Sequence, residues 1–247
     1  MAKEEISIEI DPKSKLAAIP GTNCMMGVTQ VTQRLYKKVM GWNPSWFQRS
    51  NDDLDDDEKN ALKNDTADNP VEQVSWFDAV YFCNKLSMAE GLDPAYSVDG
   101  ETDPGYWGYT PHQDESIDSD VECDFDSNGY RLPTNDEWEE AAHGGEDCAY
   151  SGSDDLDEVG WYDGNSDNVT HPVAQKMANG YGLYDMSGNV WEWVWDSDPD
   201  YPGWRFYRGG SYGNRAGICE VSCRYGRYAD DQDVVLGFRL LRPKENS

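Results

Sequence analysis

The chain has 247 residues, and its 48 acidic against 20 basic side chains give a formal net charge of −28. A field of that sign repels phosphate backbones and anionic headgroups, so nucleic acid and acidic lipid are disfavoured as partners. The 10 Trp and 15 Tyr supply apolar surface for a substantial core, which argues against a disordered acidic protein.

The ends and the cysteines say little about the compartment. No apolar stretch approaches the roughly 18–20 residues of a membrane span, so no span is expected. The first residues lack the apolar segment of a signal peptide, although a leader can be missing from the chain. The six Cys are too sparse for a disulfide scaffold.

Helix signals occur in three segments of the amino-terminal half. Apolar residues recur at helical spacing between residues 35 and 40, and Gly41 ends the run. Ser75 is a good N-cap for a second helix that ends near Gly91. A third helix begins after Thr134, with Glu137 completing a capping box, and ends at Gly144-Gly145.

The other segments favour loops and short strands. The acidic run 52–58 predicts a solvated loop, and residues 93–133 predict turns with short strands. Trp191, Trp193 and Trp195 alternate with other residues, a strand period that puts the three rings on one face, where they are expected to pack in the core. With no internal repeat or linker, we expect a single α+β domain, loop-rich, with two or three helices and short antiparallel strands.

Several ordered motifs resemble the formylglycine-generating-enzyme, or sulfatase-modifying-factor, family. The matching blocks are Met26-Gly27 through Met40-Gly41, Asn69-Pro70-Val71 with Val74-Ser75-Trp76, Tyr130-Arg131-Leu132-Pro133-Thr134 with Glu137-Trp138-Glu139, Gly182 to Asp196, Arg208-Gly209-Gly210-Ser211-Tyr212 and Leu236-Gly237-Phe238-Arg239-Leu240. The resemblance implies an elaborated C-type-lectin fold over residues 20–243, preceded by an N-terminal extension, residues 1–19.

Within that family the carboxy-terminal part is most similar to the variable proteins of diversity-generating retroelements. That similarity implies a non-enzymatic ligand-binding protein, in which a rigid frame presents residues of the segment 203–235 as a variable receptor surface. Asn214 joins the positions such proteins vary, and we call the whole set the display residues. They are Gly203, Trp204, Tyr207, Gly213, Asn214, Arg215, Gly217, Ile218, Cys223, Tyr225, Gly226, Arg227, Tyr228, Asp231, Asp233, Val234 and Val235.

The alternative implied by the family is a copper-dependent oxidase that makes formylglycine from a sulfatase cysteine. The family's enzymes use two cysteines after Gly-Gly-Ser-Tyr, because soft Cu(I) favours thiolate ligands. The second of these positions holds Cys219, but the first holds Asn214, and Cys223 lies four residues beyond Cys219. We therefore expect no catalytic residues and a buried, apolar role for Cys219.

The resemblance also implies a structural calcium ion as the one cofactor. The family's site maps onto Asp185, Glu192 and backbone carbonyls near Ser187, Gly188 and Val190. Two carboxylates with carbonyl oxygens suit a hard cation. The family's other calcium site has no clear counterpart in the stretch 165–168.

Other motifs give weaker signals. Residues 209–213 satisfy G-x-S-x-G, but every His precedes them, which disfavours a hydrolase. Residues 124–129 copy half of an EF-hand loop, yet position twelve is Asn135, so a tight turn is expected instead. The chain has neither a nucleotide-binding glycine motif nor the Glu-Pro-Asn or Gln-Pro-Asp triplet of sugar-binding lectins.

The expected partner is a macromolecule, most readily a protein. Trp204, Tyr225 and Tyr228 sit among turn residues, and such aromatics supply contact area at low entropic cost. Asp230, Asp231 and Asp233 beside them favour a partner with a basic patch. Variable proteins that bind other cells must be exported, so the cell surface or the extracellular space is expected, with a cytoplasmic location as the alternative.

Overall fold

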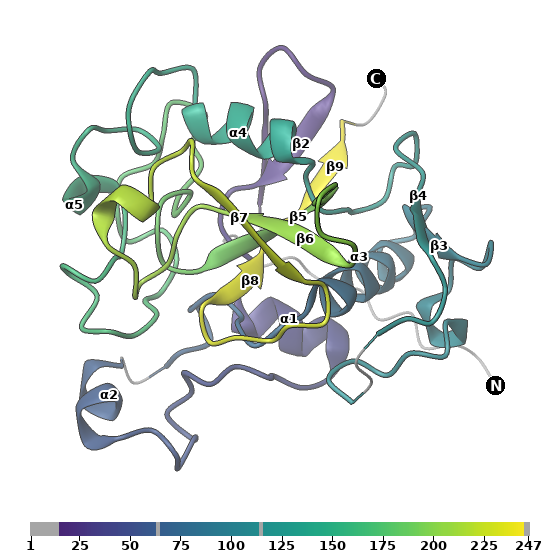
Figure 1. The fold of residues 1–247 in the computed structure, drawn as a ribbon, viewed down its shortest axis with the longest axis horizontal. Helices are drawn as coiled ribbons and strands as arrows, with labels where there is room; N and C mark the ends of the chain where they lie inside the picture. The colour runs from purple at the N-terminus through teal and green to yellow at the C-terminus, as the bar shows by residue number, and fades with distance from the viewer. Residues whose placement is uncertain (1–14, 63–64, 114–115, 245–247) are drawn as a thin grey trace.

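The computed structural model describes residues 15–62, 65–113 and 116–244, and these form one α+β unit rich in loops (Figure 1). Its helices are α1 (Gln33–Met40), α2 (Asp56–Ala61), α3 (Trp76–Ala89), α4 (Asn135–His143) and α5 (Leu156–Val159). Its strands are β1 (Leu16–Ala18), β2 (Cys24–Gly27), β3 (Tyr96–Val98), β4 (Val121–Cys123), β5 (Trp191–Ser197), β6 (Trp204–Arg208), β7 (Arg224–Tyr228), β8 (Leu236–Phe238) and β9 (Leu241–Pro243).

The strands of the described ranges form three sheets, of which the four-stranded one contains the display residues Trp204, Tyr207 and 225–228; the other display residues lie in the segments that connect its strands. Its order is β7-β6-β5-β8, with β5 and β8 parallel and the other pairs antiparallel. The remaining sheets are β1-β2-β9 and β3-β4. Because β7 has only one neighbour, it is an edge strand whose outer side faces away from the sheet.

The three predicted helices are confirmed, and their ends follow the predicted caps. Thr32 accepts a hydrogen bond from the Leu35 amide at the start of α1, and Gly41 ends it in the left-handed region. Ser75 and Thr134 each open a capping box, for α3 and α4 respectively. These helices were predictable because each terminus is encoded by residues within one turn of it.

Two short helices were not predicted. The acidic run 52–58 is only partly a loop, because Asp55 and Glu58 form a capping box that begins the exposed helix α2. Helix α5 is four residues long and begins after Asp155. Neither helix has the apolar period on which the sequence prediction relied, since acidic first-turn residues and capping stabilise them instead.

Strand β5 separates two hydrophobic cores. Trp191 and Trp193 are buried against α1 and α3, and Trp195 packs against the same cluster. Val194 points the other way, into the cluster that contains Trp138 of α4. Figure 1 shows α4 on one side of this sheet and α1 and α3 on the other. The prediction that the three tryptophans share one face of a strand and pack in the core is confirmed.

The domain begins earlier than residue 20. Residues 16–18, predicted as part of an extension, form β1, which pairs antiparallel with β2. Residues 1–14 of that predicted extension lie outside the described residues. In the described part of the chain, no helix is both long and apolar enough to cross a membrane. All six cysteines are free thiols.

Candidate functional site: an aromatic hairpin on a buried frame

The candidate site is the β6–β7 hairpin with the loop that follows it. The two strands pair from Trp204↔Tyr228 to Arg208↔Arg224, with Tyr207 opposite Tyr225. Since side chains alternate along a strand, the pairs Trp204–Tyr228 and Tyr207–Tyr225 project from opposite faces of the hairpin. Tyr225 and Tyr228 on the edge strand β7 are exposed, and Trp204 and Tyr207 on the inner strand β6 are half-buried.

Aromatic rings contact one another on both faces. Trp204 stacks on Tyr201 at 4.7 Å between ring centroids and meets Tyr228 edge-on at 5.7 Å. On the other face Tyr225 stacks with Tyr207 at 6.3 Å and meets Trp191 at 5.5 Å. Such ring pairs hold large side chains in fixed orientations while one side stays in water. Tyr228 is 56% exposed and Tyr225 43%.

Burial alternates sharply along the segment that contains the display residues. Every display residue is exposed or half-buried. Residues 208–212 between them are buried, and so are residues 236–240 that follow them. Ala216 and Arg224, which lie between display residues, are half-buried and exposed respectively. The segment therefore consists of a buried frame and accessible side chains between its blocks.

Arg208 anchors the frame below the hairpin. Its buried guanidinium pairs with Glu139 of α4, donates to the Cys223 carbonyl at 2.9 Å, and lies over the Trp138 ring. The two glycines that follow, Gly209 and Gly210, are required because neighbouring atoms leave no room for a side chain. Gly210 has φ +76°, and a Cβ there would lie 2.5 Å from the sulfur of Cys219. The start and the end of the hairpin connection are therefore fixed to the same core.

The loop after β7 is held by ion pairs. Arg227 binds Asp231 at 2.8 Å and Asp233 at 3.0 Å. Backbone hydrogen bonds from Gln73 to Asp233 and from Trp191 to Val235 attach the loop to the segment before α3 and to β5. Because one guanidinium offsets only one of the two carboxylates, this group keeps one negative charge, less than the sequence alone had suggested for a basic partner.

A groove beside the hairpin has carboxylates of its own. It encloses about 390 Å³ between residues 116–121 and the β6–β7 hairpin. Asp118, Asp120 and Asp230 line it together with Tyr228. Sequence reasoning missed Asp118 and Asp120 as neighbours of the site, because they lie far from the hairpin along the chain. It also missed Tyr201, which stacks on Trp204 and accepts a hydrogen bond from the Trp204 amide at 3.0 Å.

The two positions that align with the family's cysteines, Asn214 and Cys219, and the nearby Cys223 make local contacts. Asn214 Oδ1 accepts hydrogen bonds from the Ser211 amide at 3.0 Å and its hydroxyl at 2.7 Å, so it caps the turn after the glycines. Cys219 is fully buried, as predicted, and burial raises the pKa of its thiol to about 12. Cys223 is half-buried, and its sulfur lies 3.4 Å from the Gly217 carbonyl.

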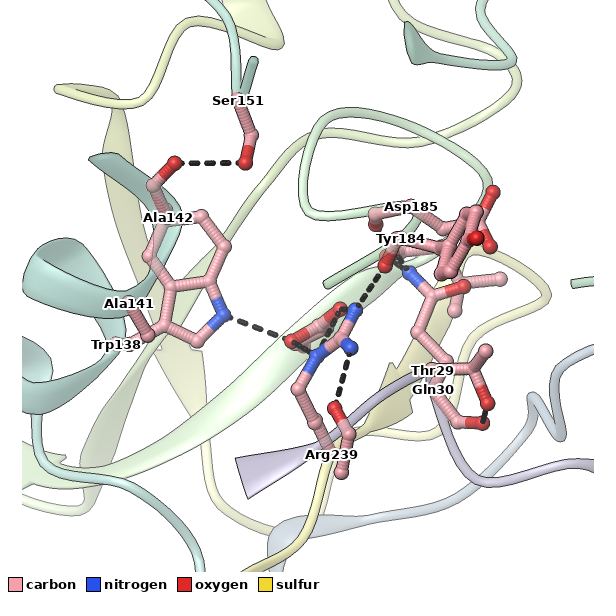
Figure 2. A network of polar contacts seen from close by, with 12 residues as sticks. Thr29, Gln30, Trp138, Ala141, Ala142, Ser151, Tyr184, Asp185 and Arg239 are labelled. Carbon is pink, nitrogen blue, oxygen red and sulfur yellow. Dashed lines mark hydrogen bonds and ion pairs between the residues drawn. The ribbon is translucent and has the colours of Figure 1, made fainter. Parts of the chain in front are cut away.

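The residues predicted to hold calcium converge only in part (Figure 2). The carbonyl oxygens of Asp185, Gly188 and Val190 do meet, but around the Nε2 of Gln30 at 3.1, 3.3 and 2.8 Å. Glu192 is taken by a buried ion pair with Arg239, and its second oxygen accepts from Trp138 Nε1 at 2.7 Å. Ser187 lies in the same buried turn. Glu192 therefore does not fit as a calcium ligand in this arrangement.

The buried side chain of Glu72 predicts a pH effect on stability. Its fully buried carboxylate accepts hydrogen bonds from the Trp46 and Phe47 amides, and burial raises its pKa to about 8. An acid whose pKa is higher in the folded state favours folding below its unfolded pKa, and this contribution is lost as the pH rises through the folded value.

We therefore expect the wild-type protein to lose on the order of 3 kcal/mol of unfolding free energy from this group between pH 5 and pH 9. The variant Glu72→Gln, which mimics the neutral acid, is expected to lack that component of the pH dependence. Urea denaturation of both proteins across this pH range measures it. Parallel pH profiles for the two proteins would show that Glu72 ionises normally.

Known proteins similar to this chain in sequence and in structure have the same kind of fold. The family model described as "Sulfatase-modifying factor enzyme 1-like domain" matches residues 12–244. The structure of Treponema denticola variable protein 1 superposes with a TM-score of 0.78 at 33% identity, covering 94% of this chain and 92% of that one.

Two relatives differ in name and in extent of similarity. The chaperone protein LppX of Paenibacillus barcinonensis is 36% identical over 244 residues, covering 89% of this chain and 80% of that protein. The formylglycine-generating enzyme of Streptomyces coelicolor is 36% identical over 144 residues, 45% of this chain and 46% of the enzyme. The chain is thus a member of the sulfatase-modifying factor enzyme 1-like family, with the C-type-lectin-like fold of a variable protein.

Proposed function

We propose that the chain is a non-enzymatic ligand-binding protein whose display residues form a variable receptor surface for a protein partner. The observation that supports it best is the alternation of burial: accessible side chains lie between blocks of frame that are packed in the core. Recognition residues on loops and edges held by a rigid scaffold can change without loss of the fold. The structural similarity to Treponema denticola variable protein 1 supports the same function.

The test of variability is to sequence codons 195–245 from many cells of a source population. We expect differences to concentrate at the display residues, while codons 208–212 and 236–240 stay constant. Buried positions tolerate few changes, because a substitution in the core typically lowers the free energy of unfolding by about 1 kcal/mol or more. Differences spread evenly over the window, or a segment without differences, would contradict a variable surface.

The surface would suit a partner with basic side chains. Asp118, Asp120 and Asp230 line the groove beside Tyr228, and the net charge of −28 adds long-range attraction for a cationic protein. Arg205, also in the groove lining, is engaged with the Trp195 carbonyl at 2.8 Å and lies over the Trp76 ring. The carboxylates therefore dominate the charge that the groove offers. A protein that binds other cells acts outside the cell, so we place it at the cell surface.

The contacts of the cysteine positions support a role without catalysis. Asn214 stands where the copper enzymes of the family have a thiol and is engaged in capping the turn. The raised pKa of Cys219 keeps its thiol protonated near neutral pH, and a thiolate is the form that binds copper(I).

We expect a titration of the reduced protein with Cu(I) to show no tight stoichiometric binding at the pair Cys219 and Cys223. A competition assay with a chromogenic Cu(I) chelator measures it, and the variant Cys219→Ala serves as the matched control. Stoichiometric binding that this substitution abolishes, together with oxygen consumption on a Cys-bearing peptide, would favour the oxidase instead.

A further inference from the structure

Gln30 occupies the centre of a buried turn that carries three inward carbonyl groups. It lies in the loop between β2 and α1 and is 1% exposed. Its Nε2 is within hydrogen-bond distance of the carbonyl oxygens of Asp185, Gly188 and Val190. Figure 2 shows the side chain entering this turn beside the Arg239 pair.

The backbone of the turn is what directs these carbonyls to one point. Asp185, Gly188 and Asn189 have φ values of +56°, +96° and +62°, a conformation that an extended or helical chain does not adopt. Converging carbonyl oxygens repel one another unless a cation or N–H donors lie between them. An amide nitrogen has two hydrogens, so it can serve three acceptors when one hydrogen is shared.

The orientation of the amide is fixed by its surroundings. Turning the Gln30 carboxamide over would place Oε1 against the three carbonyl oxygens. In the present orientation Oε1 is buried and has no hydrogen-bond partner among the described residues. The hydrogen bonds to the three carbonyl oxygens therefore stabilise this orientation by more than the unsatisfied Oε1 costs.

The neighbouring carboxylate is not available to change this balance. Arg239 donates to both oxygens of Glu192, at 2.8 and 3.0 Å, and Trp138 donates to the second. A cation at the carbonyl cluster would thus have to displace the Gln30 amide and would gain no free oxygen from Glu192. The Asp185 carboxylate accepts from the Ala174 amide at 2.8 Å through Oδ2, while its Oδ1 is buried without a hydrogen-bond partner among the described residues. With Glu192 paired to Arg239 and an amide nitrogen at the centre of the three carbonyls, the residues present do not fit the two-carboxylate calcium site that the family resemblance implies.

We propose that Gln30 performs the role of that cation, and that the fold of this chain is independent of calcium. The consequence reaches the display residues, because the same turn holds the frame. The amide of Gly188 donates to the Gly209 carbonyl at 2.8 Å, and the amide of Tyr212 donates to the Asn189 carbonyl at 2.8 Å. The Gln30 side chain therefore locks the turn on which the base of the display segment rests.

The first test compares the melting temperature of the wild-type protein in EDTA with that in millimolar calcium chloride. Ligand that binds only the folded state raises the melting temperature. We expect equal values within error, and no stoichiometric calcium by elemental analysis of protein purified without chelator. A calcium-dependent increase, or one bound calcium ion that the variant Glu192→Gln removes, would overturn the proposal.

The variant Gln30→Glu is the sharper test. A carboxylate against three carbonyl oxygens is expected to lower the melting temperature in EDTA and to create a response to calcium. Gln175→Glu, at an exposed glutamine, is the matched control and should change neither value. Equal melting temperatures of Gln30→Glu and the wild-type protein in EDTA would show that the amide does not serve these carbonyls.

A second variant keeps the proposal testable if Gln30→Glu does not fold. Gln30→Met preserves length but removes both donors, and it is expected to lower the melting temperature in EDTA by roughly 5 °C. Differential scanning calorimetry measures this value. An unchanged melting temperature of Gln30→Met would equally overturn the role assigned to Gln30.

Discussion

Replacement of Arg239 by methionine is expected to lower the free energy of unfolding by about 3–5 kcal/mol. Arg239 is fully buried, pairs with the fully buried Glu192, and donates to the carbonyls of Gly27 at 2.8 Å and Tyr184 at 2.7 Å. It therefore joins strand β2, the turn before β5 and β5 itself. Loss of the guanidinium leaves a buried carboxylate with Trp138 as its remaining donor and two carbonyls unpaired. Urea denaturation of the variant measures the effect.

Arg34 provides the matched control for this prediction. It also binds a carboxylate, that of Asp68 at 3.1 Å, but its side chain is 46% exposed. Because solvent screens such a pair, Arg34→Met should cost less than about 1 kcal/mol. Adding Glu192→Gln to Arg239→Met removes the stranded charge and should recover part of the loss. Equal losses of unfolding free energy in Arg34→Met and Arg239→Met would mean that burial does not determine how much an ion pair contributes to stability.

The features of the fold that were predictable from the sequence are those determined by residues close to one another along the chain. The N-caps Thr32, Ser75 and Thr134 each accept a hydrogen bond from the amide three positions further on, so their helices were predictable. The alternation of Trp191, Trp193 and Trp195 likewise reports one face of one strand. In both cases the signal and the structure that it specifies lie within one short segment.

Contacts between distant segments were not predictable from the pattern of one sequence. The parallel pairing of β5 with β8 brings Trp191 beside Leu236, and no local signal encodes it. Gln30 reaches a turn that is 155 residues away, so its role at the carbonyl cluster required coordinates. The ion pairs of Arg227 are close in sequence, yet they depend on the loop turning back over β7. Of the three carboxylates that the sequence placed beside the aromatic residues, Asp231 and Asp233 therefore share Arg227, and Asp230 lines the groove.

The three aromatic display residues lead to the largest expected effect on binding. We expect the combined variant Trp204→Ala, Tyr225→Ala and Tyr228→Ala to lose at least about 100-fold in affinity, because central aromatic side chains dominate interfaces. The probe is the tightest peptide selected from a phage-displayed random library on immobilised wild-type protein, and it is expected to be basic. Calorimetric titration of both proteins with that peptide measures the ratio, and circular dichroism checks that the fold is kept.

The matched control removes exposed aromatics of similar size from outside the segment 203–235. Trp42, Tyr106 and Phe125 are 39%, 77% and 45% exposed, and their alanine variant should bind the peptide within about twofold of wild type. Because the pairs Trp204–Tyr228 and Tyr207–Tyr225 lie on opposite faces of the hairpin, separate variants then assign the peptide to one face. Trp204→Ala with Tyr228→Ala probes the face of the hairpin that carries Phe206, and Tyr225→Ala probes the face beside Trp191. Full affinity in the combined variant, or an equal loss in the control, would place the receptor surface elsewhere on the molecule.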